Sequence, residues 1–272
     1  MQFFKYQGTG NDFVMLDQRE RQHLARTDVA QVARLCDRRF GIGADGVILL
    51  EKHPDFDFEM VYFNSDGSQS FCGNGGRCTV AFARQLGAVQ GETCRFLAID
   101  GPHEARFAPP QESSRTGKTP DETWVELKMR DVPSVEMAAP DTYILNTGSP
   151  HFVRFVPDLA AFDIVREGRA VRYSERFRAE GINVNLAAAL ENGIQMQTYE
   201  RGVEDETLSC GTGVTAAALA HFLHTRQSPG SLEIPVKTRG GNLAVRFTAD
   251  ANGSFSDVWL CGPAVRVFEG II

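Results

Sequence analysis

A Cys-Gly-x-Gly motif occurs twice in this chain, and each copy opens an apolar, alanine-rich segment that is typical of a helix. The copies begin at Cys72 and Cys210. A helix N-terminus presents unpaired backbone N–H groups and the positive end of the helix dipole, so it lowers the pKa of a thiol and binds anions. The two motifs therefore predict a pair of matched, chemically active thiols.

Other landmarks recur in the same order about 140 positions later, which indicates a tandem duplication. A repeat of this length is a whole domain, because solenoid units span only roughly 20 to 50 residues. The matched pairs are Phe13 with Phe152, Gly41 with Gly181, Asn64 with Glu200, and Cys72 with Cys210.

The predicted elements define the fold class. Helical patterns cover Thr27 to Phe40, Asn74 to Leu86 and Val214 to His224, and short strand patterns outnumber them. Short links between the strands favour antiparallel or mixed sheets. The length of 272 residues suits two domains. We therefore expect an α+β protein with two similar domains, each a mixed or antiparallel β-sheet wrapped around a central helix.

The stretch from Pro109 to Pro120 is polar, rich in turn-forming residues and free of large apolar side chains. It predicts an interdomain linker or a loop.

Net charge and hydropathy limit the kinds of molecule that we expect the protein to bind. The net charge is −7 and the pI about 5.4, which argue against nucleic acid or an anionic membrane. No apolar run approaches the roughly 18 residues needed to span a bilayer, and Met1 to Lys5 shows no signal-peptide core. We expect a cytoplasmic protein that acts on a small molecule.

The six cysteines have irregular spacing, unlike a secreted disulfide framework, so we expect free thiols. Cys36, Cys94 and Cys261 are expected to behave as small buried hydrophobes. Neither a C-x-x-C pair nor a motif for pyridoxal phosphate is present, and His221 and His224 form only an ordinary helical pair. The sequence therefore predicts no metal and no cofactor.

Two thiols suit inversion at the α-carbon of an amino acid. One thiolate removes the proton, and a thiol on the opposite face returns one. Two similar domains that close about a pseudo-twofold axis would bring equivalent cysteines to opposite walls of an interdomain cleft. The Gly-x-Gly backbone would let N–H groups bind the substrate carboxylate as negative charge develops.

More ordinary interpretations exist for each residue taken alone. One Cys-Gly-x-Gly can be a tight loop before a helix that buries a cysteine. His151 can be a structural histidine, Glu200 and Arg201 a surface ion pair, and the asparagines turn residues. The repetition of the cysteine motif is what favours the catalytic interpretation.

Several motifs, in this order, resemble those of the diaminopimelate epimerase family. The resemblance covers essentially the whole chain, as far as Gly262-Pro263-Ala264-Val265. The motifs are Gly10-Asn11-Asp12-Phe13, Phe63-Asn64-Ser65-Asp66-Gly67, Cys72-Gly73-Asn74-Gly75-Gly76-Arg77-Cys78, Gly148-Ser149-Pro150-His151, Asn183-Val184-Asn185, Glu200-Arg201-Gly202 and Cys210-Gly211-Thr212-Gly213.

The resemblance implies a cofactor-independent enzyme that interconverts LL- and meso-diaminopimelate, for lysine and peptidoglycan synthesis. It implies the two-domain fold of that family, with the active site between the domains, and a homodimer. It also implies that the last strand returns to the first domain. We therefore place the first domain at 1–117 with 263–272, and the second at 118–262.

The same resemblance assigns roles to individual residues. Cys72 and Cys210 are the acid and base and exchange roles with direction, while His151 and Glu200 assist proton transfer. Backbone amides hold the reacting carboxylate, and other side chains contact mainly the distal end of the substrate. The amides are those of Gly73, Asn74, Gly211 and Thr212, and the side chains are those of Asn11, Asn64, Asn183 and Arg201.

Two positions depart from the family pattern. Ser149 stands where many members have asparagine, and Gly46 where many have glutamine. The first departure implies a shorter or water-mediated contact, and the second the loss of one.

Two alternatives remain open from the sequence. A proline or hydroxyproline racemase would share the two-thiol chemistry but would give Asn64, Asn183 and Arg201 no second amino acid group to bind. A redox protein would instead use the paired thiols as a switchable disulfide.

Overall fold

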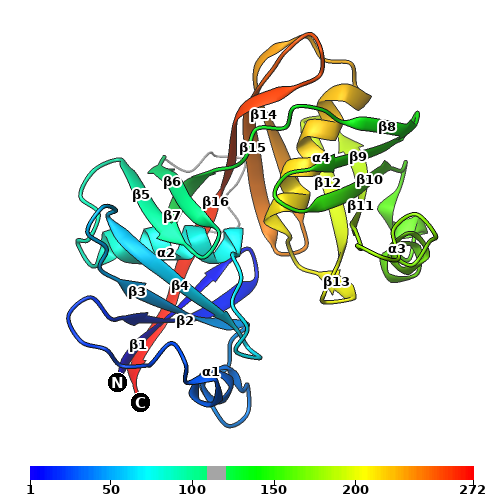
Figure 1. Cartoon of the computed structure of the whole chain (residues 1–272). Helices are drawn as coiled ribbons and strands as arrows, with labels where there is room; N and C mark the ends of the chain where they lie inside the picture. Colours follow the sequence, from blue (N-terminus) through cyan, green and yellow to red (C-terminus); the bar gives the residue numbers. More distant parts are fainter. Residues whose placement is uncertain (109–120) are drawn as a thin grey trace. The chain divides into compact units, whose positions relative to one another are not determined.

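The computed structural model describes residues 1–108 and 121–272, which form two compact units (Figure 1). The described part of unit 1 comprises residues 1–108, 121–127 and 262–272, and unit 2 comprises 128–261. The predicted linker from Pro109 to Pro120, and with it the boundary at 117, lies outside the described residues. Each unit is described by itself.

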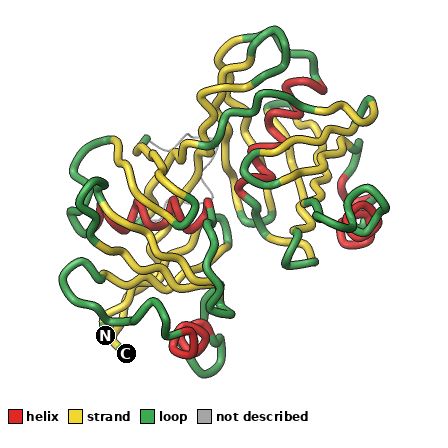
Figure 2. Tube along the Cα trace, in the orientation of Figure 1, coloured by secondary structure: helices red, strands yellow, loops and turns green. Residues whose placement is uncertain are grey.

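Among the described residues of unit 1, eight strands form a closed ring around helix α2, Gly73–Gln85 (Figures 1 and 2). Each strand pairs with the next, and β16 closes the ring by pairing with both β7 and β1. The strands are β1 (Gln2–Gly8), β2 (Asn11–Asp17), β3 (Gly46–Glu51), β4 (Phe58–Asn64), β5 (Thr93–Ala98), β6 (Gly101–Phe107), β7 (Glu122–Lys128) and the second half of β16 (Phe255–Ile271).

Unit 2 repeats this topology around helix α4, Gly211–His224. From β9 to β16, strand pairs are antiparallel, parallel, antiparallel, parallel and then twice antiparallel, as they are from β1 to β7. The strands are β8 (Glu136–Ala139), β9 (Thr142–Asn146), β10 (Pro150–Phe155), β11 (Asn183–Leu190), β12 (Gly193–Glu200), β13 (Asp205–Thr207), β14 (Gly230–Thr238) and β15 (Gly241–Ala249). The expected α+β fold, two similar domains with mixed sheets around a helix, is confirmed.

The strand register corrects one detail of the duplication. With Phe63 taken as equivalent to Tyr199, the pairings of successive strands place His151, not Phe152, at the position of Phe13. Counted from the shared glycines Gly10 and Gly148, Phe13 and His151 are both the third residue after the glycine. Matching Phe13 with Phe152 instead would require one inserted residue in the second copy, which the strand pairing does not have. The difference matters, because it makes His151 the counterpart of a buried phenylalanine.

Strand β7 groups with unit 1, although the sequence boundary assigns residues 121–127 to the second domain. The reason is pairing, since β7 lies between β6 and β16 in the ring of unit 1. Residues 262–272 also belong to unit 1, where Ile272 donates its N–H to the carbonyl of Met1 at 2.9 Å.

The two central helices are buried on nearly every side. In α2, Phe82 packs against the rings of Phe4 and Tyr6, with centroids 5.0 and 5.7 Å apart. In α4, a run of fully buried alanines lets strands approach closely around the helix. This surrounding sheet holds each helix N-terminus, and the cysteine on it, in a fixed place.

Two peripheral helices complete the described elements. Helix α1, Val29–Cys36, is shorter than its predicted range because Asp37 is extended, and Asp28 caps it by accepting the N–H of Gln31 at 3.1 Å. Helix α3, Ile164–Arg172, was not predicted, and the 3₁₀ turn η2 (Leu159–Ala161) precedes it. Its Gly168 is required because a Cβ there would lie 2.4 Å from Tyr199.

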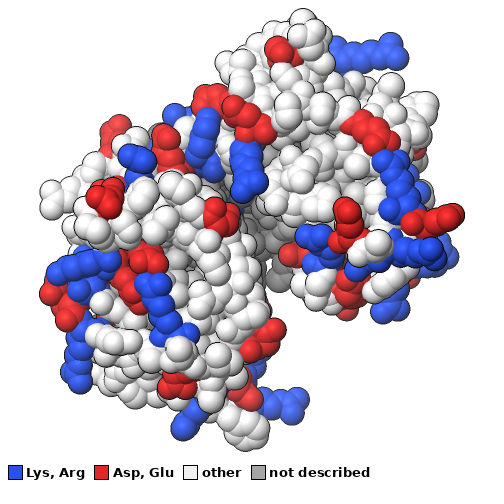
Figure 3. All heavy atoms as spheres, viewed as in Figure 1, with Lys and Arg blue, Asp and Glu red and all other residues white. Residues whose placement is uncertain are grey.

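The surface carries acidic and basic side chains interspersed over the face shown in Figure 3. Among the described residues, no helix is long and apolar enough to cross a membrane.

Truncation of a central-helix side chain should destabilise unit 1. We expect Phe82→Ala to lower the free energy of unfolding by roughly 3–5 kcal/mol, because it leaves a cavity beside Phe4 and Tyr6. Phe40→Ala, at a side chain 85% exposed, should change it by less than about 0.5 kcal/mol. Urea unfolding of both variants measures this, and equal losses would contradict the buried position of α2.

Candidate active site

Each unit holds one cysteine of the repeated motif, so the candidate site consists of two half-sites. In unit 1, Cys72 is the N-cap of α2, and its carbonyl accepts the first helical hydrogen bond, from Gly76, at 2.8 Å. Gly73 and Asn74 are the first two residues of α2, where the backbone N–H groups of a helix point away from its body and can bind an anion. The predicted position of Cys72 at a helix N-terminus is confirmed.

The side-chain amides of Asn11 and Asn74 form a hydrogen-bonded chain next to the Cys72 thiol. The Cys72 Sγ donates to Asn11 Oδ1 at 3.3 Å, and Asn74 Nδ2 lies 3.5 Å from the same oxygen. The other end of the Asn11 amide, Nδ2, donates to Asp45 Oδ2 at 2.5 Å. The side chains of Asn11 and Asn74 therefore both lie at the thiol.

Charged side chains hold Asp45, which binds the Asn11 end of this amide chain, in place. Arg38 bridges Asp12 and Asp45, at 2.7 Å to each, and Lys5 pairs with Asp12 at 2.7 Å. Burial opposes ionisation of Asp12, but hydrogen bonds from Arg38 and Lys5 overcome it and lower its pKa to about 2. Asp12 and its partners therefore form a lasting ion-pair cluster next to Asn11.

Asn64 closes the turn that precedes Cys72. Its Nδ2 donates to Ser68 Oγ at 3.0 Å and Ser70 Oγ at 3.2 Å, and its Oδ1 accepts from Tyr62 at 3.0 Å. In this state the amide of Asn64 serves the turn, so its expected contact with a substrate is a proposal.

The glycine at position 46 has a structural cause. A Cβ on Gly46 would lie 2.3 Å from the carbonyl oxygen of Phe63 and 2.4 Å from the ring of Tyr62. The Tyr62 ring thus fills the space next to Gly46, and no larger side chain fits there.

In unit 2, Cys210 is the N-cap of α4, and its carbonyl accepts from Val214 at 2.8 Å. Its Sγ lies 3.5 Å from the hydroxyl of Thr212, in the first turn of the same helix. The predicted helix N-terminus at Cys210 is likewise confirmed, with Gly211 as the first helical residue.

Two hydroxyls and an imidazole form a compact cluster beside Cys210. His151 Nε2 lies 2.9 Å from Thr212 Oγ1 and 3.0 Å from Ser149 Oγ, and the two hydroxyl oxygens are 3.0 Å apart. Asn183 Nδ2 donates to Ser149 Oγ at 3.1 Å. Ser149, which stands where many family members have asparagine, therefore takes part in this cluster through its hydroxyl.

The hydrogen bonds of Asn185 set the tautomer of His151. The Asn185 Nδ2 donates to the Phe152 carbonyl at 3.0 Å, and its Oδ1 accepts from Thr198 at 2.9 Å. The same Nδ2 lies 3.1 Å from His151 Nδ1, which must accept. The ring proton therefore resides on Nε2 and points to the hydroxyls next to Cys210.

The imidazole of His151 is held neutral. Burial, with a smaller effect of Arg201, lowers the pKa of His151 to about 3. A Cβ on Gly213 would lie 2.6 Å from Asn185 Oδ1, so the glycine of the motif leaves room for the amide that orients the imidazole.

Asn183, Glu200 and Arg201 lie together at the ends of β11 and β12. The Arg201 N–H donates to Asn183 Oδ1 at 2.8 Å, and its guanidinium donates to the carbonyl of Glu180 at 2.9 Å. Burial raises the pKa of the Glu200 carboxyl. A buried carboxyl with a raised pKa is a candidate for proton transfer.

Sequence reasoning assigned no role to Asp45 or Asn185, which orient Asn11 and His151. A signal existed for Asn185, because it lies two residues from Asn183 on a strand and so on the same face. Asp45 gave no such signal, since only the parallel pairing of β2 with β3 brings it next to Asn11.

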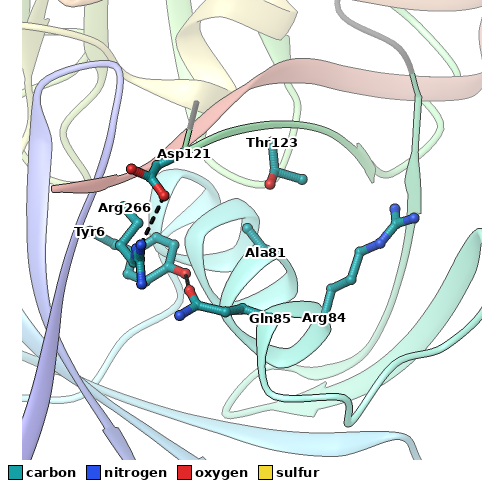
Figure 4. Close-up of a pocket in the computed structure, with 7 residues that line it drawn as sticks. All are labelled: Tyr6, Ala81, Arg84, Gln85, Asp121, Thr123 and Arg266. Atoms are coloured by element: carbon teal, nitrogen blue, oxygen red, sulfur yellow. Dashed lines mark hydrogen bonds and ion pairs between the residues drawn. The ribbon is translucent and has the colours of Figure 1, made fainter. Parts of the chain in front are cut away.

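A cavity of about 280 Å³ in unit 1 lies away from Cys72 (Figure 4). It adjoins the last turns of α2, whereas Cys72 caps the first turn. Arg266 pairs with Asp121 at 3.0 Å, and Tyr6 donates to Gln85. The lining residues are Tyr6, Ala81, Arg84, Gln85, Asp121, Thr123 and Arg266.

Within residues 1–108 and 121–272, no group of three or more His, Cys, Asp or Glu side chains is arranged to hold a metal ion.

Comparison with known proteins identifies relatives along the whole chain. Residues 3–119 and 143–267 match the family model of diaminopimelate epimerase. The diaminopimelate epimerase of Flavobacterium psychrophilum is 46% identical over 275 residues, covering 100% of both chains. That of Aquifex aeolicus is 38% identical over 282 residues, covering 99% of this chain and 97% of its own.

Solved structures share the fold at low identity. A phenazine biosynthesis protein of the PhzF family from Bacillus anthracis has a TM-score of 0.73 at 13% identity, covering 100% of this chain and 99% of its own. A hydroxyproline epimerase from Agrobacterium vitis has a TM-score of 0.63 at 15% identity, with coverages of 99% and 91%. These likenesses concern the fold alone.

The state of His151 predicts a pH dependence. Its folded pKa of about 3 lies below the ordinary 6.5, so the unfolded chain takes up the proton first. The stabilisation from neutral His151 is complete above 6.5 and is lost as pH falls from 6.5 toward 3. We expect unfolding free energies of His151→Gln to fall less steeply over this range than those of the parent protein.

Nuclear magnetic resonance of the labelled ring carbon checks the same point directly. The His151 signal should not shift between pH 8 and about 5. A titration with a midpoint near 6.5 would contradict the buried, neutral imidazole.

Proposed function

Because the chain belongs to the diaminopimelate epimerase family, we propose that it interconverts LL- and meso-diaminopimelate without a cofactor. The observation that carries this proposal beyond family membership is the pair of cysteines, Cys72 and Cys210, each at the N-terminus of a buried helix. The reaction would serve amino-acid biosynthesis, supplying lysine and peptidoglycan precursors.

The two thiols would act on opposite faces of one α-carbon. One sulfur removes the α-proton as a thiolate, the electron pair of the C–H bond stays on carbon, and the other sulfur delivers its proton to the opposite face. The carbanion is stabilised by delocalisation into the carboxylate, whose oxygens would bind backbone N–H groups at the helix starts. Those groups belong to Gly73, Asn74, Gly211 and Thr212.

His151 and Glu200 would assist the thiols in different ways. The neutral imidazole donates from Nε2 to hydroxyls beside Cys210, which supports negative charge on that sulfur. The raised pKa of Glu200 supports a role in holding or passing a proton, or in binding the ammonium group of the substrate.

The distal end of diaminopimelate carries a second ammonium and carboxylate. We assign its recognition mainly to Asn64, Asn183 and Arg201, whose amide and guanidinium groups can bind both charges. Asn11, which lies between the Cys72 thiol and Asp45, would contact the substrate near the reacting carbon. In unit 2, the backbone bond from Arg201 to Asn183 supports a shared role for these two residues. Proline has no such distal group, so a proline racemase is the weaker alternative. A redox switch has no observation in its favour.

A cytoplasmic homodimer completes the proposal. Exposed apolar side chains near the end of β16, at Val267, Phe268 and Ile271, support burial against a second copy. Light scattering should give about twice the chain mass of 30.0 kDa, and a mass of one chain would refute the dimer.

Epimerase activity on LL-diaminopimelate, in buffer without added cofactor, tests the function. Cys72→Ala and Cys210→Ala should each reduce kcat at least about a thousand-fold, because each removes one partner of the proton exchange. Circular dichroism should show both variants folded.

Cys94→Ala is the matched control, because Cys94 is a buried cysteine on β5, outside both half-sites. It should keep most of the activity. Substantial turnover by either half-site variant, or turnover of proline in place of diaminopimelate, would contradict the proposal.

A further inference from the structure

The two cysteines meet hydrogen-bonding groups of opposite kinds. The Cys72 sulfur lies against a carbonyl oxygen, that of the Asn11 side chain, whereas the Cys210 sulfur lies against the hydroxyl of Thr212. We infer that in the resting protein Cys72 is the thiol and Cys210 the thiolate, and that Asp45 is a positioning residue that keeps Cys72 protonated through Asn11. The assignment of acid and base rests on the proposed function.

A chain of amides between two charges fixes the direction of Asn11. At one end the buried Arg77 donates from Nη2 to Asn74 Oδ1 at 3.0 Å, so the Asn74 Nδ2 must point to Asn11. At the other end Asp45 can only accept, so it requires the Asn11 Nδ2. Both ends therefore turn the Asn11 oxygen toward Cys72.

This orientation distinguishes the two states of Cys72. A thiol donates its S–H to the Asn11 oxygen, as the 3.3 Å contact allows. A thiolate would face the lone pairs of the same oxygen, so this oxygen favours the thiol over the thiolate. The Asp45 carboxylate, 2.5 Å from the Asn11 amide nitrogen, adds negative charge nearby and disfavours a second anion.

The cluster of His151, Thr212 and Ser149 in unit 2 favours the thiolate, whereas the surroundings of Cys72 favour the thiol. The His151 Nε2–H donates to the oxygen of Thr212 or Ser149, which leaves a hydroxyl proton to donate onward. The Thr212 hydroxyl, 3.5 Å from Cys210, can direct that proton at the sulfur. Hydrogen bonds donated to a charged form favour it, so this arrangement stabilises a thiolate.

The duplication explains how the halves came to differ. The ring of Phe13 would lie 3.5 Å from a Cβ on Gly75, and the ring of His151 3.4 Å from one on Gly213. The same place under the two helix starts therefore holds an apolar ring in unit 1 and a proton donor in unit 2. Unit 1 has no imidazole at this place to support a thiolate at Cys72.

Other charged or titratable groups lie near Cys72 on its own helix or belong to the ion-pair cluster beside Asn11. They belong to its own helix, to β1 and β2, and to the connection between α1 and β3. They are Arg77, Cys78, Lys5, Asp12, Arg38 and Asp45. Arg38 pairs with Asp12 and Asp45, and Lys5 pairs with Asp12, so these ion pairs hold Asp45 beside Asn11 and maintain the direction of the Asn11 amide.

A defined order of proton transfer follows. The Cys210 thiolate takes the α-proton of the first substrate molecule, and the Cys72 thiol gives its proton to the other face. The protein then holds a Cys72 thiolate and a Cys210 thiol. It must exchange one proton with water, or run in reverse, before it is again in its resting state.

Alkylation with iodoacetamide tests the assignment without any turnover, because the thiolate is the reactive form. Initial rates at each cysteine of the full-length protein are followed by peptide mass spectrometry from pH 5 to 10. The midpoint of the pH profile, which does not depend on accessibility, should lie at least about one unit lower for Cys210 than for Cys72. Equal midpoints, or a lower one at Cys72, would overturn the inference.

Variants test the role of Asp45. Asp45→Ala frees the Asn11 amide to turn and should raise alkylation of Cys72 at pH 7 about three- to ten-fold, leaving the Cys210 midpoint unchanged. Asp45→Asn keeps an oxygen acceptor for Asn11 and should show a smaller increase. A merely structural effect would instead raise the plateau at both cysteines with no shift of midpoint, and would refute the positioning role.

Thr212 offers the reciprocal test. Thr212→Val removes the hydroxyl and should raise the Cys210 midpoint alone, whereas Thr212→Ser should keep it. An unchanged Cys210 midpoint in Thr212→Val would refute the thiolate assignment. Loss of epimerase activity has no bearing on these results, so failure of the proposed function and failure of this inference are distinguishable.

Discussion

The buried helix N-terminus is the interaction on which the rest of this structure depends. Each unit surrounds one helix with β-strands, and the first residue before that helix is a cysteine. A helix start leaves N–H groups unpaired, and burial makes their electrostatic effect stronger than it would be in water. The strands hold these groups in place, so the cost of arranging them is met during folding rather than during the reaction.

Duplication supplied two such helix starts, and divergence around them made their surroundings unlike. The register that equates Phe13 with His151 also equates Gly46 with Asn183. Unit 1 thus combines an apolar ring with a chain of amides that ends on Asp45. Unit 2 combines an imidazole with two hydroxyls. A two-base exchange needs opposite protonation states, and these surroundings provide a physical reason for the difference.

Much of the architecture could be predicted from local patterns. The repeated motif and its alanine-rich continuation defined α2 and α4, and the spacing of landmarks indicated two domains. The grouping of β7 with unit 1 could not be predicted, because it depends on pairing with β16 far along the chain. Helix α3 was missed because its residues are largely polar and its glycine suggests a turn, whereas Gly168 is required for packing against Tyr199.

In the site, too, some residues could be predicted from the sequence and others could not. Cys72, His151 and Cys210 were identifiable because their motifs are long and repeated. The roles of Asp45 and Asn185 were not, since each acts through another side chain that only the sheet register brings near. Gly46 was recognised as a departure, but its cause, the ring of Tyr62, depends on the pairing of β3 with β4.

The central claim is that two separate groups exchange protons with one α-carbon. Early in the conversion of LL-diaminopimelate in deuterium oxide, the meso product should carry solvent deuterium at the inverted carbon while the unreacted LL pool stays unlabelled. This result is expected because the base that removes the proton is not the acid that returns one. Equal labelling of substrate and product at early times, or product that retains the original proton, would contradict the account.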